Sequence, residues 1–184
     1  MSDKYKVFDG DEVYFVTFTI VDWIKVLDDD SYKQLIIDAI KYYQINRGLV
    51  VYAFCIMPNH VHMIVQATGK SNISEILRDL KKITSRQIVK KLEQQKQESQ
   101  QYILKKFADA GEPLKRITNY KVWQDGNRAK LVYSNKFLME KLNYIHNNPI
   151  EYGLCSQPWE YKYSSAVNYA EKDSVLDVVL LSIW

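Results

Sequence analysis

The stretch LVVYAFCIMPNHVHMIVQA, residues 49–67, decides the fold. Leu49 to Met57 is a nearly continuous apolar run, which is typical of a β-strand that is buried on both faces. Pro58-Asn59 interrupts this run, and His60 to Ala67 then has the composition of the next strand. The stretch therefore predicts two consecutive strands with a very short connection, as neighbouring antiparallel strands have.

The residues before position 49 predict a strand and then a helix. Val13 to Val21 is rich in β-branched and aromatic residues, which strands favour. Asp28-Asp29-Asp30-Ser31 offers N-cap chemistry, and apolar residues then recur at helical spacing from Leu35 to Tyr43. Gly48, directly after Arg47, supplies a helix stop.

A long amphipathic helix is predicted from Ser71 to about Leu92. Its apolar stripe consists of Ile73, Ile76, Leu77, Leu80 and Ile83. The Gln-rich stretch Gln94 to Gln101 fits either a solvated extension of this helix or a loop, and Ala108 to Pro113 is predicted as loop. We expect the polar stretch around residues 94–115 to be an insertion in a single domain that spans residues 1–184.

The last part of the chain predicts short strands and one more helix. Tyr120 to Gln124 and Lys130 to Tyr133 look like short strands around an Asp-Gly-Asn turn. Ser134 can cap a helix from about Asn135 to Asn147, which should end before Pro149 because a residue that precedes proline is pushed out of helical geometry. The order of elements predicts an α+β fold, an antiparallel sheet with helices packed on it.

Composition excludes several classes of protein. The chain has 184 residues, which suits one domain, and its 47% apolar and 26% charged residues are typical of a globular protein. No apolar run is long enough to cross a bilayer, the N-terminus is unlike a signal peptide, and Cys55 and Cys155 form no CxxC pattern. We therefore expect a cytoplasmic protein with no membrane partner. The sequence also lacks a phosphate-binding glycine loop, a nucleophile elbow and a structural zinc pattern.

His60-Val61-His62 is the first candidate site. Side chains at positions i and i+2 of a strand point to the same face, so the two imidazoles should leave the sheet together. Two neutral imidazoles placed in this way can ligate a metal ion. The alternative is a pair of histidines on a polar sheet face, and the motif alone does not decide between the two interpretations.

Tyr144 and Asn148 are four residues apart in the last predicted helix and therefore share a helix face. A phenol and a carboxamide could thus reach into one site, but from the helix alone a tyrosine at the core boundary and an asparagine C-cap are the simpler interpretation. His146 lies on roughly the opposite side of the helix from Tyr144, because each residue turns the helix by about 100°. We expect His146 to have a packing, capping or DNA-contacting role, and to become a candidate ligand only if the helix unwinds before Pro149.

Basic residues recur every four positions along the long helix. This stripe consists of Arg78, Lys82, Arg86 and Lys90, with Lys81 beside it. It suits contact with DNA phosphates, but a solvated face fits as well because Glu75, Asp79 and Glu93 partly neutralise it. The net charge of +3 is too small to decide the question.

Two ordered motifs resemble those of a known family. Met57-Pro58-Asn59-His60-Val61-His62 resembles the histidine motif of the IS200-like and REP-associated tyrosine transposases. Tyr144-Ile145-His146-Asn147-Asn148-Pro149, followed by Gly153-Leu154, resembles their tyrosine motif. Shorter matches lie at residues 122–124, 159 and 163–166.

The resemblance implies a ferredoxin-like antiparallel sheet with helices packed on one face, the core of HUH endonucleases. It implies that His60, His62 and Asn148 hold a divalent cation, Mg²⁺ or Mn²⁺, although other members have Gln where Asn148 stands. Tyr144 would be the nucleophile that forms a 5′-phosphotyrosine with single-stranded DNA next to a hairpin. Some members act as homodimers and others as monomers, so the resemblance leaves the oligomeric state open.

Three other functions remain as alternatives. A replication initiator or relaxase would share the chemistry but usually carries further domains. A DNA-hairpin-binding protein or regulator would keep the scaffold without cleaving DNA. A small metal-binding protein would show no salt-dependent binding of DNA.

Overall fold

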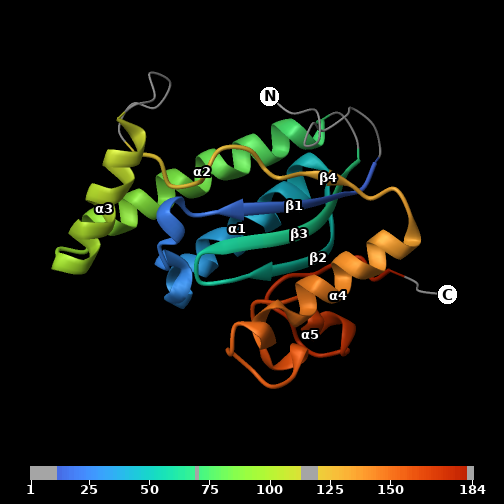
Figure 1. Cartoon of the computed structure of the whole chain (residues 1–184). Helices are drawn as coiled ribbons and strands as arrows, with labels where there is room; N and C mark the ends of the chain where they lie inside the picture. The colour runs from blue at the N-terminus through green and yellow to red at the C-terminus, as the bar shows by residue number, and fades with distance from the viewer. Residues whose placement is uncertain (1–11, 69–70, 113–119, 182–184) are drawn as a thin grey trace.

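A computed structural model of the chain describes residues 12–68, 71–112 and 120–181. Within these residues it contains a four-stranded antiparallel sheet with the strand order β2-β3-β1-β4 (Figure 1). The strands are β1 (Tyr14–Thr19), β2 (Leu49–Ile56), β3 (His60–Ala67) and β4 (Lys130–Leu131). Helix α1 (Asp30–Arg47) follows β1 and helix α2 (Ile73–Gln94) follows β3. This β-α-β-β-α-β order is that of a ferredoxin-like fold, so the predicted α+β class is confirmed.

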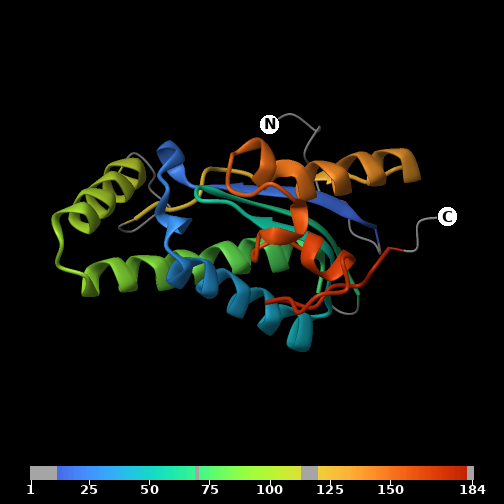
Figure 2. The same cartoon turned by 90° about the horizontal axis from the view of Figure 1, so that it is seen from below.

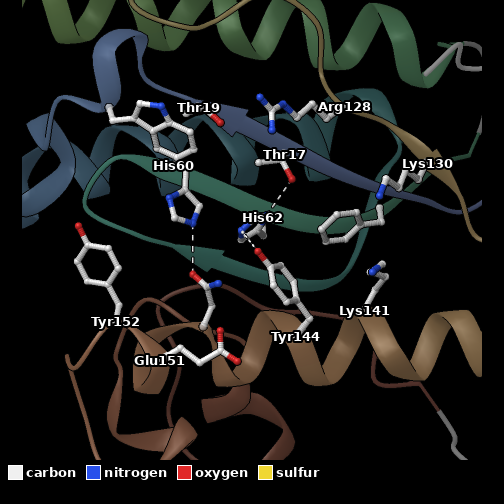
Figure 3. Close-up of a pocket in the computed structure, with 13 residues that line it drawn as sticks. Thr17, Thr19, His60, His62, Arg128, Lys130, Lys141, Tyr144, Glu151 and Tyr152 are labelled. Carbon is white, nitrogen blue, oxygen red and sulfur yellow. Dashed lines mark hydrogen bonds between the residues drawn. The ribbon is translucent and has the colours of Figure 1, made fainter. Parts of the chain in front are cut away.

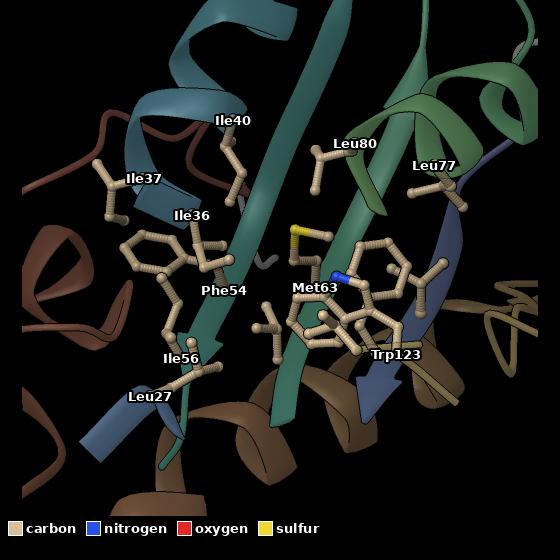
Figure 4. Packing of buried hydrophobic residues seen from close by; sticks show 14 of the residues in the cluster. Leu27, Ile36, Ile37, Ile40, Phe54, Ile56, Met63, Leu77, Leu80 and Trp123 are labelled. Atoms are coloured by element: carbon tan, nitrogen blue, oxygen red, sulfur yellow. The ribbon is translucent and has the colours of Figure 1, made fainter. Parts of the chain in front are cut away.

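Alternation along β3 gives the sheet two different faces. Val61 and Met63 point into the main hydrophobic core beneath α1 and α2 (Figure 4). His60 and His62 are buried on the other face together with Ile64, which belongs to a second, smaller core cluster. The period of two that the sequence predicts for this strand therefore places both imidazoles on one side of the sheet.

Helix α4 (Asn135–Glu151) packs on the face that carries the histidines (Figure 2). Leu142 and Ile145 of α4 join the smaller core cluster with Phe15 and Ile64. The expectation that helices pack on one face holds for α1 and α2 but omits α4, which covers part of the opposite face. This placement brings residues near position 144 close to strand β3.

Local sequence explains the bounds of α1. Asp29 caps the helix by accepting a hydrogen bond from the Ser31 amide at 2.7 Å. Gly48 ends it in the left-handed conformation with φ of 69°, and its amide donates to the Tyr43 carbonyl. A Cβ at Gly48 would lie 1.8 Å from the carbonyl oxygen of Thr68, so both the backbone angle and the close approach require glycine.

The structure corrects the prediction for the polar stretch. Residues Glu98–Gly111 form helix α3, so the loop predicted from Ala108 is wrong as far as residue 111, while Pro113 lies outside the described residues. Leu104 and Phe107 of α3 are buried in the main core, and this amphipathic packing explains why the segment is helical.

The apolar stripe of α2 also differs from the prediction at one position. Ile83 is 37% exposed, whereas Thr84 and Ile88 are fully buried. The helix begins one residue after Asn72, whose side chain caps it by accepting a hydrogen bond from the Glu75 amide at 2.8 Å.

The predicted strand at Tyr120–Gln124 is reduced to a single bridge between Trp123 and Ile20. The segment still runs beside the end of β1. The Val21 amide donates to the Val122 carbonyl at 2.9 Å, and the Gln124 amide donates to the Thr19 carbonyl at 2.8 Å. Positive φ angles at Gly126 (72°) and Arg128 (43°) interrupt the extended conformation before β4.

Helix α4 continues through Pro149 to Glu151, which corrects the predicted end before this proline. Ser134 caps the helix as expected by accepting a hydrogen bond from the Phe137 amide at 3.2 Å. Pro149 lies in the last turn, so its missing N–H costs only one helical hydrogen bond, and burial of Asn148 and Pro149 offsets this cost. Asn148 therefore lies inside the helix and is not a cap.

Short elements and a C-terminal segment complete the described structure. The segment from Tyr163 to Val179 covers the free edge of β2, since the amides of Ser165 and Val179 each donate to β2 carbonyls at 2.9 Å. None of the described helices has the length and apolarity needed to cross a membrane. The short helical elements are η2 (Val21–Trp23), η3 (Val26–Asp28), η4 (Pro158–Glu160) and α5 (Ala166–Tyr169).

Candidate active site

The two predicted metal ligands of β3 lie side by side. The ring centroids of His60 and His62 are 4.6 Å apart, and both side chains are almost fully buried. Strand β1 pairs with them residue by residue, so that Thr19 lies opposite His60 and Thr17 opposite His62. The adjacent strand thus supplies a hydroxyl beside the imidazole pair (Figure 3).

Hydrogen-bond partners favour one tautomer of the neutral His60 ring. Nδ1 lies 2.7 Å from the side-chain oxygen of Asn59, and Nε2 lies 3.2 Å from the side-chain oxygen of Asn148. The amide nitrogen of Asn59 donates to the Trp23 carbonyl at 3.2 Å, so its oxygen must be the atom that faces the imidazole. The shorter contact therefore takes the single proton of a neutral imidazole, and the lone pair of Nε2 faces Asn148.

This arrangement leaves two acceptors facing each other. Burial lowers the pKa of His60, with a smaller opposing effect from Asn148, so a doubly protonated ring is disfavoured at neutral pH. Nε2 of His60 and the amide oxygen of Asn148 are then both acceptors at 3.2 Å. Imidazole nitrogen and amide oxygen are suitable donors for Mg²⁺ or Mn²⁺. The residues present therefore fit a divalent metal.

His62 is also oriented by a contact at its Nδ1 atom. Its Nδ1 lies 2.9 Å from the hydroxyl of Thr17, and its ring stacks on Phe15 at a centroid distance of 5.6 Å. Burial lowers its pKa to about 3, assisted by His60 and Lys141, so the ring is neutral at pH 7. With Nδ1 engaged by the threonine, Nε2 faces the pocket.

Helix α4 places Tyr144 beside this nitrogen. The hydroxyl oxygen of Tyr144 lies 3.4 Å from Nε2 of His62, and the two rings meet edge to face at 5.1 Å. The ammonium of Lys141, one turn earlier, lies over the rings of Tyr144 and Phe15 at 5.8 and 5.6 Å. The tyrosine is 39% exposed, so a ligand in the pocket can reach its hydroxyl.

A cavity of about 490 Å³ joins these groups and has two distinct ends (Figure 3). Arg128, Lys130 and Lys141 line the part near Tyr144 and Thr17. The sequence analysis did not identify these three cations, because they come from a turn, a two-residue strand and a helix that share no motif. The other end, beside His60, contains Trp23, Glu151 and Tyr152.

His146 lies away from this cavity. Its Nε2 is 2.9 Å from the hydroxyl of Ser165, and its ring packs edge to face on Tyr169. Burial lowers its pKa to about 4. The helix does not unwind before Pro149, so His146 stays on the side expected for a structural residue.

The predicted basic stripe lies elsewhere, on α2. Its four members at residues 78, 82, 86 and 90 are exposed, and three of them line a groove of about 690 Å³ between α2 and residues 120–126. Lys81 has a different environment, since its ammonium donates to the carbonyls of Gln124 and Gly126 at 2.7 and 2.8 Å. Contact with DNA stays a prediction for the stripe, while Lys81 stabilises the adjoining turn.

The chain, whose fold carries the paired histidines, belongs to the IS200-like transposase family. The model of this family matches residues 13–120, which include both histidines but not Tyr144. A curated protein of Haemophilus influenzae named as a REP-associated tyrosine transposase is 27% identical over 114 residues. The match covers 61% of this chain and 56% of that protein, so it spans little more than half the length of this relative.

A solved structure shows the same fold over nearly the whole chain. It is described as a REP-associated tyrosine transposase bound to a REP hairpin. It superposes with a TM-score of 0.65 and covers 99% of this chain and 96% of that chain, at 18% sequence identity. The similarity therefore includes α4, which carries Tyr144 and lies beyond the region that the family model matches.

Proposed function

We propose that this protein is a metal-dependent endonuclease and strand transferase that cuts single-stranded DNA beside a hairpin through a 5′-phosphotyrosine. The observation that carries the proposal is the 3.4 Å distance between the Tyr144 hydroxyl and Nε2 of His62, in the cavity that also contains His60 and Asn148. Membership of a transposase family supports DNA as the substrate. The relative that is described with a REP hairpin supports a hairpin beside the cleaved strand.

His60, His62 and Asn148 are the residues that would hold the cation. A bound Mg²⁺ or Mn²⁺ supplies charge neutralisation at a phosphate oxygen and polarises the phosphorus. The mixed nitrogen and oxygen donors accept either ion, and the two imidazoles favour Mn²⁺ slightly. Thr17 and Asn59 orient the imidazoles so that both Nε2 atoms face the cavity.

Tyr144 acts as the nucleophile. Its phenol must lose its proton before or during attack on phosphorus. The bond from the tyrosine oxygen to phosphorus forms, the bond from phosphorus to O3′ breaks, and O3′ takes up a proton. The products are a 5′-phosphotyrosine and a free 3′-hydroxyl. Because the covalent bond retains the energy of the phosphodiester, attack by another 3′-hydroxyl rejoins DNA without ATP.

Cations around the cavity bind the DNA backbone. Arg128, Lys130 and Lys141 lie on the side of Tyr144 and are placed to contact phosphates of the cleaved strand. The groove along the α2 stripe provides a second basic surface, which we assign to the hairpin. Tyr144 and both histidines meet within one chain, which supports an active site formed by a single chain, whether the protein is a monomer or a homodimer.

A labelled hairpin with single-stranded flanks of randomised sequence tests the proposal. A 3′ label should become covalently attached to the protein in Mn²⁺ or Mg²⁺, and a 5′ label should appear on a shorter strand that ends in a 3′-hydroxyl. EDTA should prevent both products. Hairpin binding without any covalent adduct would instead identify a non-cleaving DNA-hairpin-binding protein or regulator, the alternative function on this scaffold.

A further inference from the structure

Two exposed aromatic side chains form one end of the catalytic cavity. Trp23 is 52% exposed and Tyr152 is 39% exposed, and both line the cavity. The Trp23 ring lies edge to face with His60 at a centroid distance of 6.3 Å. Aromatic faces that are open to solvent beside a site for single-stranded DNA are suited to stack on unpaired bases.

The backbone holds Trp23 in a costly conformation. Asp22 and Trp23 have φ angles of 52° and 55°, a left-handed region that non-glycine residues rarely adopt. The Trp23 carbonyl accepts a hydrogen bond from Asn59, the residue that also orients His60. The backbone of Trp23 is therefore fixed relative to His60, and the exposure of the indole is not a consequence of a loosely held chain.

The order of rings across the cavity indicates which nucleotide meets this indole. Tyr144 lies against His62, His62 against His60, and His60 against Trp23, with successive centroid distances of 5.1, 4.6 and 6.3 Å. In an in-line displacement the nucleophile and the leaving oxygen lie on opposite sides of the phosphorus. A phosphate attacked by Tyr144 above the histidine pair therefore releases O3′ toward Trp23.

The charged side chains also differ between the two ends of the cavity. Lys130 and Lys141 lie at the Tyr144 end, where phosphates are favoured, whereas the aromatic end has one acidic side chain, Glu151, whose charge the nearby Lys25 offsets (Figure 3). Lys25 sits 5.5 Å from the centroid of the Tyr152 ring and helps to fix it. An uncharged base is the part of a nucleotide that suits this end of the cavity.

We propose that Trp23 and Tyr152 form a stacking site for the base of the nucleotide on the 5′ side of the scissile phosphate. The proposal rests on the proposed function, because that function defines the scissile phosphate. It assigns Trp23 as a DNA-binding residue that positions the leaving nucleotide, with Tyr152 as its partner.

An abasic scan tests the stacking site separately from cleavage. In a Tyr144→Phe background, the affinity for the hairpin with flanks is measured by fluorescence anisotropy while an abasic site is moved along the flank one nucleotide at a time. With Trp23 present, one position should stand out by a loss of about 5- to 100-fold, the range of one base–aromatic stack. With Trp23→Ala, the intact strand should bind as weakly as that abasic strand, and the abasic site should cause no further loss.

Companion variants control for folding and for general effects. Trp23→Phe should retain most of the affinity, and Tyr152→Ala should weaken binding at the same position. Trp159→Ala is the matched control, because this indole is 42% exposed, lies outside the cavity and has Lys172 over its ring. The thermal unfolding midpoint of each variant shows whether it is folded.

The outcomes distinguish the two proposals. An equal loss for intact and abasic strands in Trp23→Ala, or no loss in either, overturns the stacking site even if the enzyme cleaves DNA. A stacking position that does not adjoin the mapped 3′-hydroxyl overturns the assignment of the nucleotide. Absence of any covalent adduct in the wild-type protein overturns the proposed function, while the scan still reports whether Trp23 binds a base.

Discussion

The hydroxyl of Tyr144 lies 3.4 Å from Nε2 of His62, although 82 residues separate them in the chain. Strand β3 presents the imidazole, and α4 crosses the same face of the sheet through the packing of Leu142 and Ile145. The contact therefore depends on a helix docked by apolar side chains, and not on any local motif. It also means that one chain contains every group that the proposed attack requires.

Replacing this hydroxyl should abolish covalent chemistry and leave the protein folded. Tyr144→Phe keeps the ring that packs on His62 and Phe15 but removes the nucleophilic oxygen. We expect no protein–DNA adduct on denaturing gels, with hairpin affinity within about threefold of wild type because only one hydrogen-bonding group is removed. Tyr133→Phe is the matched control, since this tyrosine precedes the same helix and is 75% exposed. An adduct that persists in Tyr144→Phe would rule out this nucleophile.

Two glycines in the left-handed conformation should respond very differently to alanine. Gly153→Ala meets no atom within 4 Å, so only its φ of 77° opposes the change, at a cost of about 1–2 kcal/mol in the free energy of unfolding. Gly48→Ala combines a φ of 69° with a Cβ 1.8 Å from the Thr68 carbonyl oxygen, and should cost at least about twice as much. Urea unfolding of both variants measures the difference. Equal losses would show that the α1–β2 turn relaxes freely.

The sequence predicted the elements whose signals are local. The predicted bounds of β3 are confirmed, and the signal for them was local, a proline-asparagine break followed by strand-forming residues. Gly48 and Ser134 likewise have the predicted cap geometry. Helix α3 and the continuation of α4 through Pro149 were not predicted. Both depend on burial against distant residues, which outweighs the preference of the local sequence.

The sequence predicted the reactive groups of the candidate site. It did not predict the side chains that orient these groups or surround the cavity. A shared strand face and a four-residue helical spacing made the pairs His60–His62 and Tyr144–Asn148 candidates, and the resemblance to the transposase motifs assigned them to one site. No pattern in the sequence indicated that Thr17, 45 residues away, contacts His62, because that contact depends on the β1–β3 register. The same holds for the cations around the cavity, which neighbouring segments contribute one at a time.

Removing the hydroxyl beside His62 should weaken metal binding without changing the ligands. Thr17→Val has nearly the same volume, but it can no longer accept the proton of His62 Nδ1, which lies 2.9 Å from the hydroxyl. Loss of such a partner of a metal-binding histidine typically reduces metal affinity by about 10- to 100-fold. Titration with Mn²⁺, followed by the electron paramagnetic resonance of the free ion, measures the dissociation constant.

The neighbouring threonine provides the control for this change. Thr19 lies on the same face of β1 and lines the same cavity, and it is more buried than Thr17, but it is not within hydrogen-bonding distance of His62 in the structure. Thr19→Val should therefore bind Mn²⁺ as wild type does. If Thr17→Val and Thr19→Val have the same dissociation constant as wild type, the orientation of His62 does not depend on this hydroxyl.

The exposed stripe on α2 should govern the salt dependence of DNA binding if it contacts phosphates. Lys82 and Arg86 are exposed and line the groove beside α2, so Lys82→Gln and Arg86→Gln remove charge without opening the core. Removing one phosphate-binding cation should reduce the slope of log affinity against log salt by about 0.7 to 0.9. Lys41→Gln on α1, which is also exposed but does not line the groove, should leave the slope unchanged. Lys81 is unsuited to this test because its ammonium also holds two carbonyls of the adjoining turn. Slopes that are identical in all the variants would assign the stripe to solvent and confine DNA binding to the catalytic cavity.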